Sequence, residues 1–203
     1  LEDDYNIRSL AVEVNGTRCL TTKGVKQITS PSDLKGVKIR SMEAQVWQDV
    51  ITALGGTPIP VSFSELYMAL QTGVVNGQDN PISVTYANKL YEVADYIYRT
   101  DHCYNTSMWL INPDAYDALD EEDRALFDSL VEKYIHGQYR DEMGAYTEKA
   151  VADIESSGCQ IIDSSEFDIQ AFYDNAAQLI DEKYMTNDAY APFIQEIRER
   201  YHY

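Results

Sequence analysis

The chain has 203 residues and a mass of 23.1 kDa, and its 34 acidic against 16 basic side chains give a formal net charge of −18 and a pI near 4.3. This acidity argues against a general nucleic-acid binder or a binder of anionic membranes, because both need a basic surface. With 44% hydrophobic and 25% charged residues, and no apolar stretch near the roughly 20 residues of a membrane-spanning helix, the composition predicts one globular domain or two small ones.

Signals for targeting, redox chemistry and metal binding are sparse. The chain opens with the acidic sequence LEDD and no initiator Met, so we expect a processed or truncated chain, in which a missing leader is uninformative about compartment. Cys19, Cys103 and Cys159 form no CxxC pair and are expected to be small buried side chains, with one disulfide pair left open. The three histidines are too far apart for a local zinc cluster, and the sequence indicates no metal or cofactor site.

The first half of the chain alternates strand and helix signals. The β-branched run in residues 6–20 predicts a strand, and the Asn-Gly pair at 15–16 predicts a turn. A short strand is predicted at 37–40, which puts Arg40 at its end. Residues 43–54 then place apolar side chains three and four positions apart, which predicts an amphipathic helix that stops at a Gly-Gly pair.

Further elements follow as far as residue 112. Residues 58–61 are short and extended, and Ser62–Glu65 has the spacing of a capping box, which predicts a helix that ends at Gly73. The polar segment 78–81 predicts a turn from which a helix over 82–91 begins. The remaining signals are strands at 96–100 and 107–111 and a short helix that Asn112 caps before Pro113.

The second half of the chain is mainly helical. Four acidic residues at 120–123 favour a helix start, and helical periodicity continues to about residue 157, with Gly137 and Gly144 as the expected breaks. An unbroken helix of that length would be about 57 Å long, more than the roughly 43 Å diameter of a compact chain of this size, so a kink or a multi-lobed body is expected. A strand at 159–162 and helices at 166–184 and 189–201 complete the chain.

Four motifs occur together and in order in the first half. They are DLKGVKIR at 33–40, ALGGTPIP at 53–60, SELYMALQTGVVNGQDNP at 64–81 and KLYEV at 89–93. In combination they resemble the substrate-binding proteins of tripartite ATP-independent periplasmic (TRAP) transporters, the DctP family. NGTR at 15–18 and the long acidic-capped helix also fit, so the resemblance covers nearly the whole chain. Asn76 and Asp79 depart from the commoner DGQEN pattern of that family.

The resemblance implies a two-lobed α/β fold of the type II periplasmic-binding-protein kind, which closes on a small organic carboxylate and delivers it to a membrane permease pair. Family members are longer, so 1–112 is expected to be the second lobe with hinge strands, and 113–203 a helical region whose long helix, about 120–157, crosses both lobes. Most of the first lobe is then missing. The resemblance further implies a precursor with a signal peptide, a periplasmic or lipid-anchored location, and no enzymatic activity, cofactor, nucleic-acid partner or direct membrane insertion.

Two arginines are candidates for carboxylate capture. Arg40 ends a strand, where open α/β sheets bind ligands, and a guanidinium offers paired N–H donors that match the two oxygens of a carboxylate. By the resemblance, Arg40 corresponds to the family's carboxylate-binding arginine, and Arg18 to a second arginine that contacts polar groups of the ligand or supports the first. The structural alternatives are a strand-end surface ion pair for Arg40 and an exposed turn residue for Arg18.

Four more residues are candidate ligand contacts. By the resemblance, Asn80 hydrogen-bonds the ligand through its amide and Phe63 forms an apolar wall; capping of a helix by Asn80 and core packing of Phe63 are the alternatives. Met42 and Gln45 lie just after the strand-end arginine, in the segment where family members vary and where substrate choice is set. Trp47 falls on the apolar stripe of the predicted helix and is expected in the core.

Two other classes of function are weighed against a transport receptor. The same scaffold could be a sensory ligand-binding domain, which a fused membrane or signalling segment in the complete gene would reveal. An enzyme such as a lyase or hydrolase is disfavoured, because GxSxG, Walker A and GxGxxG motifs and an activated nucleophile are all missing from the sequence. The sequence leaves the ligand open among dicarboxylates, keto acids, sugar acids and aromatic acids.

Overall fold

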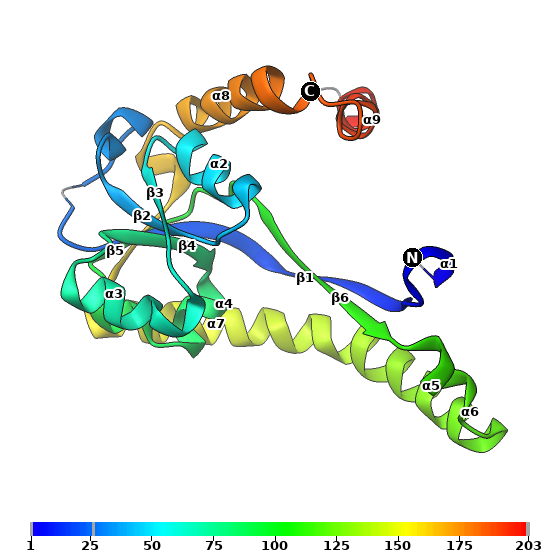
Figure 1. Ribbon diagram of the computed structural model, residues 1–203. Coiled ribbons are helices and arrows are strands. Elements are labelled where there is room, and N and C mark those ends of the chain that lie inside the picture. The colour runs from blue at the N-terminus through cyan, green and yellow to red at the C-terminus, as the bar shows by residue number, and fades with distance from the viewer. Residues whose placement is uncertain (1, 26, 202–203) are drawn as a thin grey trace.

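A mixed α/β body and a long extension make up the structure (Figure 1). The computed structural model describes residues 2–25 and 27–201. Within these residues a seven-stranded sheet has the order β3-β2-β4-β1-β5-β7, and β6 pairs with the outer part of β1 to form the extended ribbon. The strands are β1 Arg8–Thr22, β2 Lys38–Ser41, β3 Thr57–Pro60, β4 Gly77–Pro81, β5 Tyr96–Tyr98, β6 Tyr104–Ile111 and β7 Gln160–Ile162.

Strand directions bring the ends of two strands together beside β1. β2 runs parallel to β3 and β4, whereas β1 runs antiparallel to β4 and β5. The C-terminal ends of β2 and β4 therefore meet at one edge of the sheet, next to the middle of β1. Open α/β sheets bind ligands at such an edge. Here the edge carries Arg40 on β2, Asn80 on β4 and Arg18 on β1.

Helices cover both faces of the sheet. Because successive strand residues point to opposite faces, Leu20 of β1 packs with Ile51 of α2 and Phe172 of α8, while Cys19 packs with Ile154 of α7 on the other face. A smaller apolar cluster joins α3 to the 3₁₀ turn η3. The α-helices are α1 Glu2–Tyr5, α2 Gln45–Ala53, α3 Leu66–Thr72, α4 Ile82–Ala87, α5 Pro113–Asp117, α6 Glu121–Leu130, α7 Tyr139–Ser157, α8 Ile169–Leu179 and α9 Ala191–Tyr201. The 3₁₀ turns are η1 Pro31–Leu34, η2 Phe63–Glu65, η3 Leu90–Val93 and η5 Ser164–Glu166. Two π-helical segments are η4 Val131–Gln138 and η6 Ile180–Tyr184.

The long helical segment predicted from 120 to 157 is confirmed as α6, η4 and α7 in direct succession. Asp120 caps its start by accepting a hydrogen bond from the Asp123 backbone N–H, and Gly158, with φ +98°, ends it in the left-handed conformation. The wider π turns contain Gly137, so the expected irregularity lies there. The break expected at Gly144 is wrong, because that residue lies inside the regular α7.

Two turns expected from the sequence are part of strands. β1 continues through residues 15–16, where the register with β6 shifts and Gly16 has φ +105°, so the Asn-Gly pair forms a bulge in place of a hairpin turn. Residues 77–81 form the buried strand β4, in which Gln78 donates hydrogen bonds to Thr21 and Thr85. Those buried partners satisfy the polar side chains that had indicated a turn.

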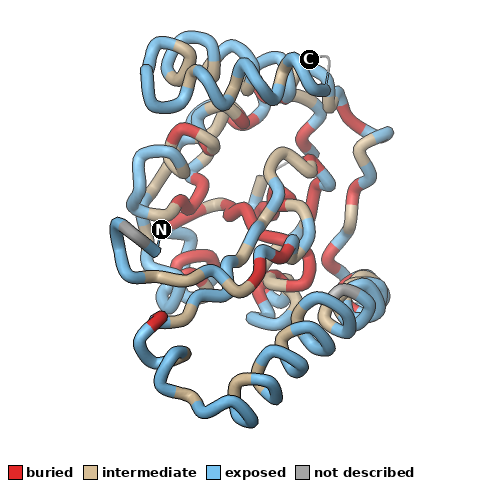
Figure 2. Tube along the Cα trace, turned by 90° about the vertical axis from the view of Figure 1, so that its right-hand side faces the viewer, coloured by how far each residue is buried: buried red, intermediate tan, exposed pale blue. Residues whose placement is uncertain are grey.

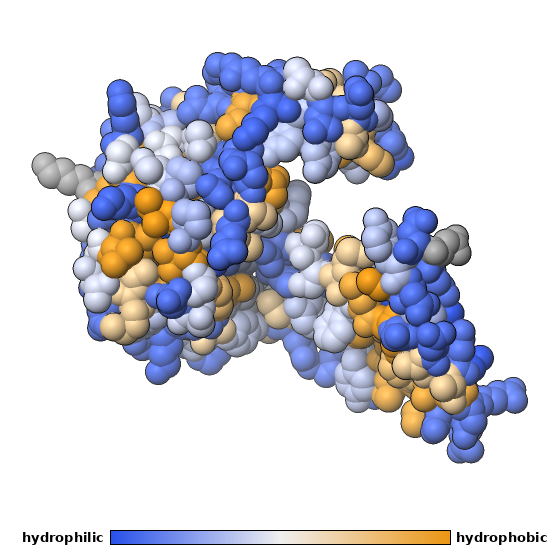
Figure 3. All heavy atoms as spheres, in the orientation of Figure 1, coloured by the Kyte–Doolittle hydropathy of each residue, from blue (hydrophilic) through white to orange (hydrophobic). Residues whose placement is uncertain are grey.

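The extension is much less buried than the body (Figure 2). Along the ribbon, several large apolar side chains are exposed: Val12, Val14, Tyr104, Met108, Trp109 and Leu110. In Figure 3 an open notch separates the C-terminal helices from the end of the extension, and apolar residues line part of the extension beside it. The body therefore has its own core, whereas the ribbon leaves an apolar surface uncovered.

Candidate functional site

Two buried arginines lie at the sheet edge formed by β1, β2 and β4. Arg18 is 2% exposed and Arg40 is 3% exposed. A guanidinium withdrawn from water needs charged or hydrogen-bonding partners, because its desolvation is otherwise costly. The partners of the two arginines differ, and this difference separates their roles.

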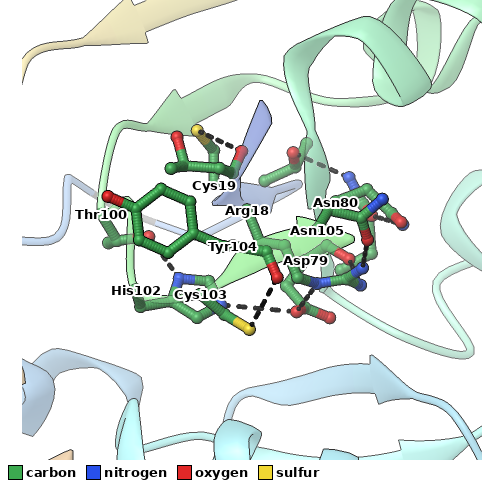
Figure 4. Close-up of polar contacts among 12 residues, drawn as sticks. Arg18, Cys19, Asp79, Asn80, Thr100, His102, Cys103, Tyr104 and Asn105 are labelled. Carbon is green, nitrogen blue, oxygen red and sulfur yellow. Dashed lines mark hydrogen bonds and ion pairs between the residues drawn. The ribbon is translucent and has the colours of Figure 1, made fainter. Parts of the chain in front are cut away.

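Arg18 is fully engaged by the protein (Figure 4). Its Nε donates to Asp79 Oδ2 at 2.6 Å, its Nη2 donates to the Asp79 backbone carbonyl, and its Nη1 donates to Asn105 Oδ1 at 2.8 Å. The Trp47 ring centroid lies 4.7 Å from the guanidinium carbon, a cation–π distance. The exposed-turn alternative for Arg18 is therefore wrong, since the residue is buried within a strand and paired with a buried carboxylate.

Asp79 joins Arg18 to the connection between β5 and β6. His102 Nε2 lies 3.4 Å from Asp79 Oδ2, and His102 Nδ1 lies 2.8 Å from the Thr100 hydroxyl. An ionised carboxylate only accepts, so a neutral ring carries its proton on Nε2 and accepts from Thr100 at Nδ1. Burial raises the pKa of Asp79, but the hydrogen bonds from His102 and Arg18, together with the charge of Arg18, outweigh burial and hold that pKa below its usual value.

Arg40 keeps donors free. Its Nε donates to the Val61 carbonyl at 2.8 Å, and the Phe63 ring centroid lies 5.7 Å from its guanidinium carbon. Among the described residues neither Nη atom has a hydrogen-bond partner, and Arg40 forms no salt bridge with them. Burial lowers the pKa of Arg40, and the charge of Arg18 adds to this, although Asp79 opposes it. The strand-end surface ion pair is therefore not what the structure has, and Arg40 is a buried cation with two unengaged donor groups.

Asn80 lies at the end of β4 and is 6% exposed. Its Nδ2 donates to Gln78 Oε1, and Pro81, not Asn80, occupies the N-cap position of α4, so the capping alternative is wrong. Residues 78 and 80 share one face of β4, opposite to Asp79. Arg18 and Asn80 therefore approach the sheet edge from different faces.

Of the remaining predicted contacts, Phe63 lies beside Arg40, whereas Met42 and Gln45 follow Arg40 in the chain. Phe63 is 43% exposed, so its ring is not ordinary core packing and has an accessible side beside the guanidinium. Met42 is half-buried just after β2, and Gln45 is exposed at the first turn of α2, where its Nε2 donates to Asp49 Oδ1 at 2.9 Å. Trp47 is half-buried against Arg18, so the core expected for it is wrong.

Sequence reasoning missed His102, Asn105 and Asp49 as members of this region, and it treated Asp79 only as a departure from a motif. Asp79 and Arg18 lie 61 residues apart, and their pairing follows from the antiparallel register of β1 with β4. A buried Asp inside a predicted strand would have been the usable signal, because such a carboxylate requires a cation. That signal was hidden when 78–81 was predicted to be a turn.

The fold and the site together define a class. An α/β body whose strand ends present a buried arginine with unengaged donors, and whose helices continue into a long extension, has the architecture of a lobe of a periplasmic solute-binding protein. The chain belongs to the family of bacterial extracellular solute-binding proteins, family 7 (DctP), whose family model matches residues 1–187.

Individual relatives agree with this assignment. The ectoine/5-hydroxyectoine-binding periplasmic protein UehA of Ruegeria pomeroyi is 31% identical over 198 residues, which cover 96% of this chain and 58% of UehA. A TRAP periplasmic solute-binding protein of Roseobacter denitrificans, solved with bound 3-deoxy-D-manno-oct-2-ulosonic acid, superposes with a TM-score of 0.80 at 30% identity over 90% of this chain and 59% of that chain. A second TRAP periplasmic solute-binding protein from the same organism, solved with bound β-D-glucuronate, superposes with a TM-score of 0.81 at 25% identity, over 94% of this chain and 62% of that chain.

The predicted family and the predicted fold class are therefore confirmed. The relatives are solute-binding proteins, not enzymes, and those compared here are periplasmic proteins. The chain spans under two thirds of the length of each of them. Within residues 2–25 and 27–201, no helix combines the length and the apolar character needed to cross a membrane.

Proposed function

We propose that this chain is the carboxylate-binding part of a TRAP solute receptor, which captures a small organic acid outside the cytoplasm and hands it to a membrane permease. The observation that carries the proposal is Arg40. A guanidinium that is 3% exposed and forms no ion pair with the described residues is costly, and a ligand carboxylate accepting from both Nη groups would satisfy it. The acids named for the relatives support a carboxylate as the ligand class.

Arg18 supports Arg40 in this proposal. Asp79 neutralises Arg18, and Arg18 Nη1 donates to Asn105. Arg18 therefore contributes a fixed polar surface to the site and not an unpaired positive charge. Asn80 adds a directional amide, Phe63 an apolar wall, and Met42 and Gln45 border the space beside Arg40. Exclusion of water as the protein closes on the acid would strengthen the Arg40 ion pair.

The domain assignment belongs to the same proposal. Residues 1–112 form the second lobe with the strands that lead out of it, and 113–203 form the helical region whose long helix crosses to a first lobe. The exposed apolar side chains of the β1–β6 ribbon and the notch in Figure 3 support this, because they are surfaces that a further lobe would cover. A periplasmic or lipid-anchored location follows from the same assignment.

The test is the affinity of the complete two-lobed protein for 3-deoxy-D-manno-oct-2-ulosonate, D-glucuronate and ectoine, measured by titration calorimetry. Arg40→Ala should weaken binding of the tightest of these by about 3 kcal/mol, more than 100-fold, because it leaves a buried carboxylate without its cation. Arg99→Ala is the control, since Arg99 is half exposed and its one ion pair within residues 2–25 and 27–201, with Asp163, is 3.9 Å long. Equal affinity in Arg40→Ala and the parent protein would contradict the proposal.

A further inference from the structure

The first turn of α2 lacks a side-chain cap, and Gln48 Nε2 donates to the Glu43 carbonyl just before the helix at 2.9 Å. Its N-cap residue, Ala44, makes no side-chain hydrogen bond to the helix start, and residues 43–46 are exposed. The core contacts of α2 come from Ile51 and Leu54, near its C-terminal end. An uncapped, exposed helix start frays unless tertiary contacts hold it.

Those contacts come from the other end of the chain. Asp49 is 5% exposed, and its carboxylate accepts from Lys183 Nζ at 2.6 Å and from the Tyr184 hydroxyl at 2.6 Å, both from η6. We call these three residues the Asp49 clasp. Burial raises the pKa of Asp49, but hydrogen bonds from Lys183, Tyr184 and Gln45 outweigh it, so that pKa lies below its usual value. The Asp49 carboxylate is thus ionised at neutral pH, in the state that accepts from both Lys183 and Tyr184.

The clasp acts on the turn of α2 that carries Gln45 and Trp47. Gln45 donates to the clasp carboxylate one helical turn away, and Trp47, on another side of the same turn, lies against Arg18. Only residues 41–44 separate Arg40 from the start of α2. The orientation of this first turn therefore sets where Gln45 and Trp47 lie relative to the two guanidinium groups.

We propose that Asp49, Lys183 and Tyr184 are positioning residues for the ligand site, and that the C-terminal segment fixes Gln45 and Trp47 beside the arginines through them. This inference rests on the proposed function. None of the three clasp residues needs to touch the ligand. Their effect on affinity comes from holding the first turn of α2 in its binding geometry before the acid arrives, so that less conformational freedom is lost on binding.

The first arm of the test reads the position of Trp47 in this chain. The sequence contains two tryptophans, so Trp109→Phe on the ribbon leaves Trp47 as the only tryptophan, whose emission is excited at wavelengths that tyrosine does not absorb. In that background, Lys183→Met and Tyr184→Phe should shift Trp47 emission to longer wavelength and speed amide exchange over residues 42–49. These variants remove one donor each and keep the side-chain bulk, whereas Asp49→Asn keeps the shape and removes the charge.

The chain offers a matched control. Asp153 on α7 also accepts from a lysine and a tyrosine, Lys149 and Tyr86, but Asp153 and Tyr86 are only half-buried, and the hydrogen bonds of this cluster join α7 to α4 and not to α2. Lys149→Met and Tyr86→Phe therefore remove the same chemistry elsewhere. They should leave both Trp47 emission and exchange over 42–49 unchanged.

The second arm measures affinity in the complete two-lobed protein with the acid that binds it most tightly among 3-deoxy-D-manno-oct-2-ulosonate, D-glucuronate and ectoine. Lys183→Met and Tyr184→Phe should each weaken binding about 3- to 10-fold, which is less than the effect of Arg40→Ala. The double variant should bind only slightly more weakly than either single variant, because both substitutions act on one carboxylate. Unchanged Trp47 emission, or changed emission with unchanged affinity, overturns the inference. Failure of the parent protein to bind any of the acids counts against the proposed function instead. In that case Trp47 emission alone tests whether the clasp positions the first turn of α2.

Discussion

Burying an arginine removes its charge from water, and the two arginines of this site are compensated to different degrees. Arg18 has a carboxylate, a carbonyl, an amide and an indole ring around it, whereas Arg40 has one carbonyl and one phenyl ring. The family resemblance predicted Arg40 as the carboxylate-binding arginine and Arg18 as a second or supporting arginine, but the residue pattern alone gave no physical reason for the difference. What separates them is Asp79, and its contact with Arg18 depends on strand register, which local sequence does not determine.

Replacing Asp79 by Asn should destabilise the fold by about 3 kcal/mol in urea unfolding, because Arg18 would remain buried beside an amide that cannot neutralise it. The control is Asp163→Asn, which removes the exposed 3.9 Å pair with Arg99 and should cost less than about 1 kcal/mol. Similar unfolding free energies for the two variants would show that the buried pair contributes no more than a surface pair.

The same pair gives the stability a pH dependence of known sign. The pKa of Asp79 is lower in the folded chain than its ordinary value of about 3.9, so its contribution is fully present above that value and is lost as pH falls through the lower folded pKa. The charged or titratable groups around it are Arg18, His102 and Arg40. Asp79→Asn should therefore lose less stability than the parent chain between about pH 4 and pH 2.

At the scale of elements, local sequence patterns predicted the helices and strands correctly where the tertiary surroundings favour the same structure as the local sequence. The strand at 37–40, the helix at 43–54 and the capped helix at Asn112 are present because apolar spacing and cap residues act within a few positions. Residues 15–16 and 77–81 were predicted as turns because Gly, Asn and Asp favour turns in isolation. In the fold, neighbouring strands supply hydrogen bonds to both segments, and tertiary pairing overrides the local preference.

Two glycines give opposite predictions for the same substitution. Gly16 sits in the β1 bulge at φ +105° with room for a methyl group, so Gly16→Ala should cost about 1–2 kcal/mol from backbone strain alone. Gly144 lies in regular helix with open space around it, so Gly144→Ala should stabilise by up to about 1 kcal/mol. Thermal unfolding of both variants checks this, and a loss of stability in Gly144→Ala would mean that α7 is not regular there.

The whole molecule combines a well-paired body with a ribbon paired on one side only. Residues 18–22 of β1 pair with β4, and residues 20–22 also pair with β5, whereas among the described strands residues 8–14 pair with β6 alone. Strands with fewer neighbours and exposed side chains open locally at lower free energy. Amide exchange should therefore be much faster at 8–14 than at 19–22 in this chain.

By the proposed domain assignment, the complete protein has a first lobe that covers the ribbon, so exchange at 8–14 should be slower there than in this chain while exchange at 19–22 stays unchanged. Residues 150–154 of α7, where Ala150 and Ile154 are fully buried, serve as an internal reference. Unchanged exchange at 8–14 in the longer protein would contradict the domain assignment.

The bulge at Gly16 divides β1 into two unequal arms. Arg8 lies eight residues from the bulge, about 26 Å along an extended strand, while Arg18 lies two residues away, about 7 Å. A rotation of about 10° at the bulge moves the far end of the ribbon by roughly 4–5 Å and Arg18 by only about 1 Å. Any rotation at the bulge would therefore displace the far end of the ribbon several times as far as Arg18, whose guanidinium Asp79 holds beside the candidate site.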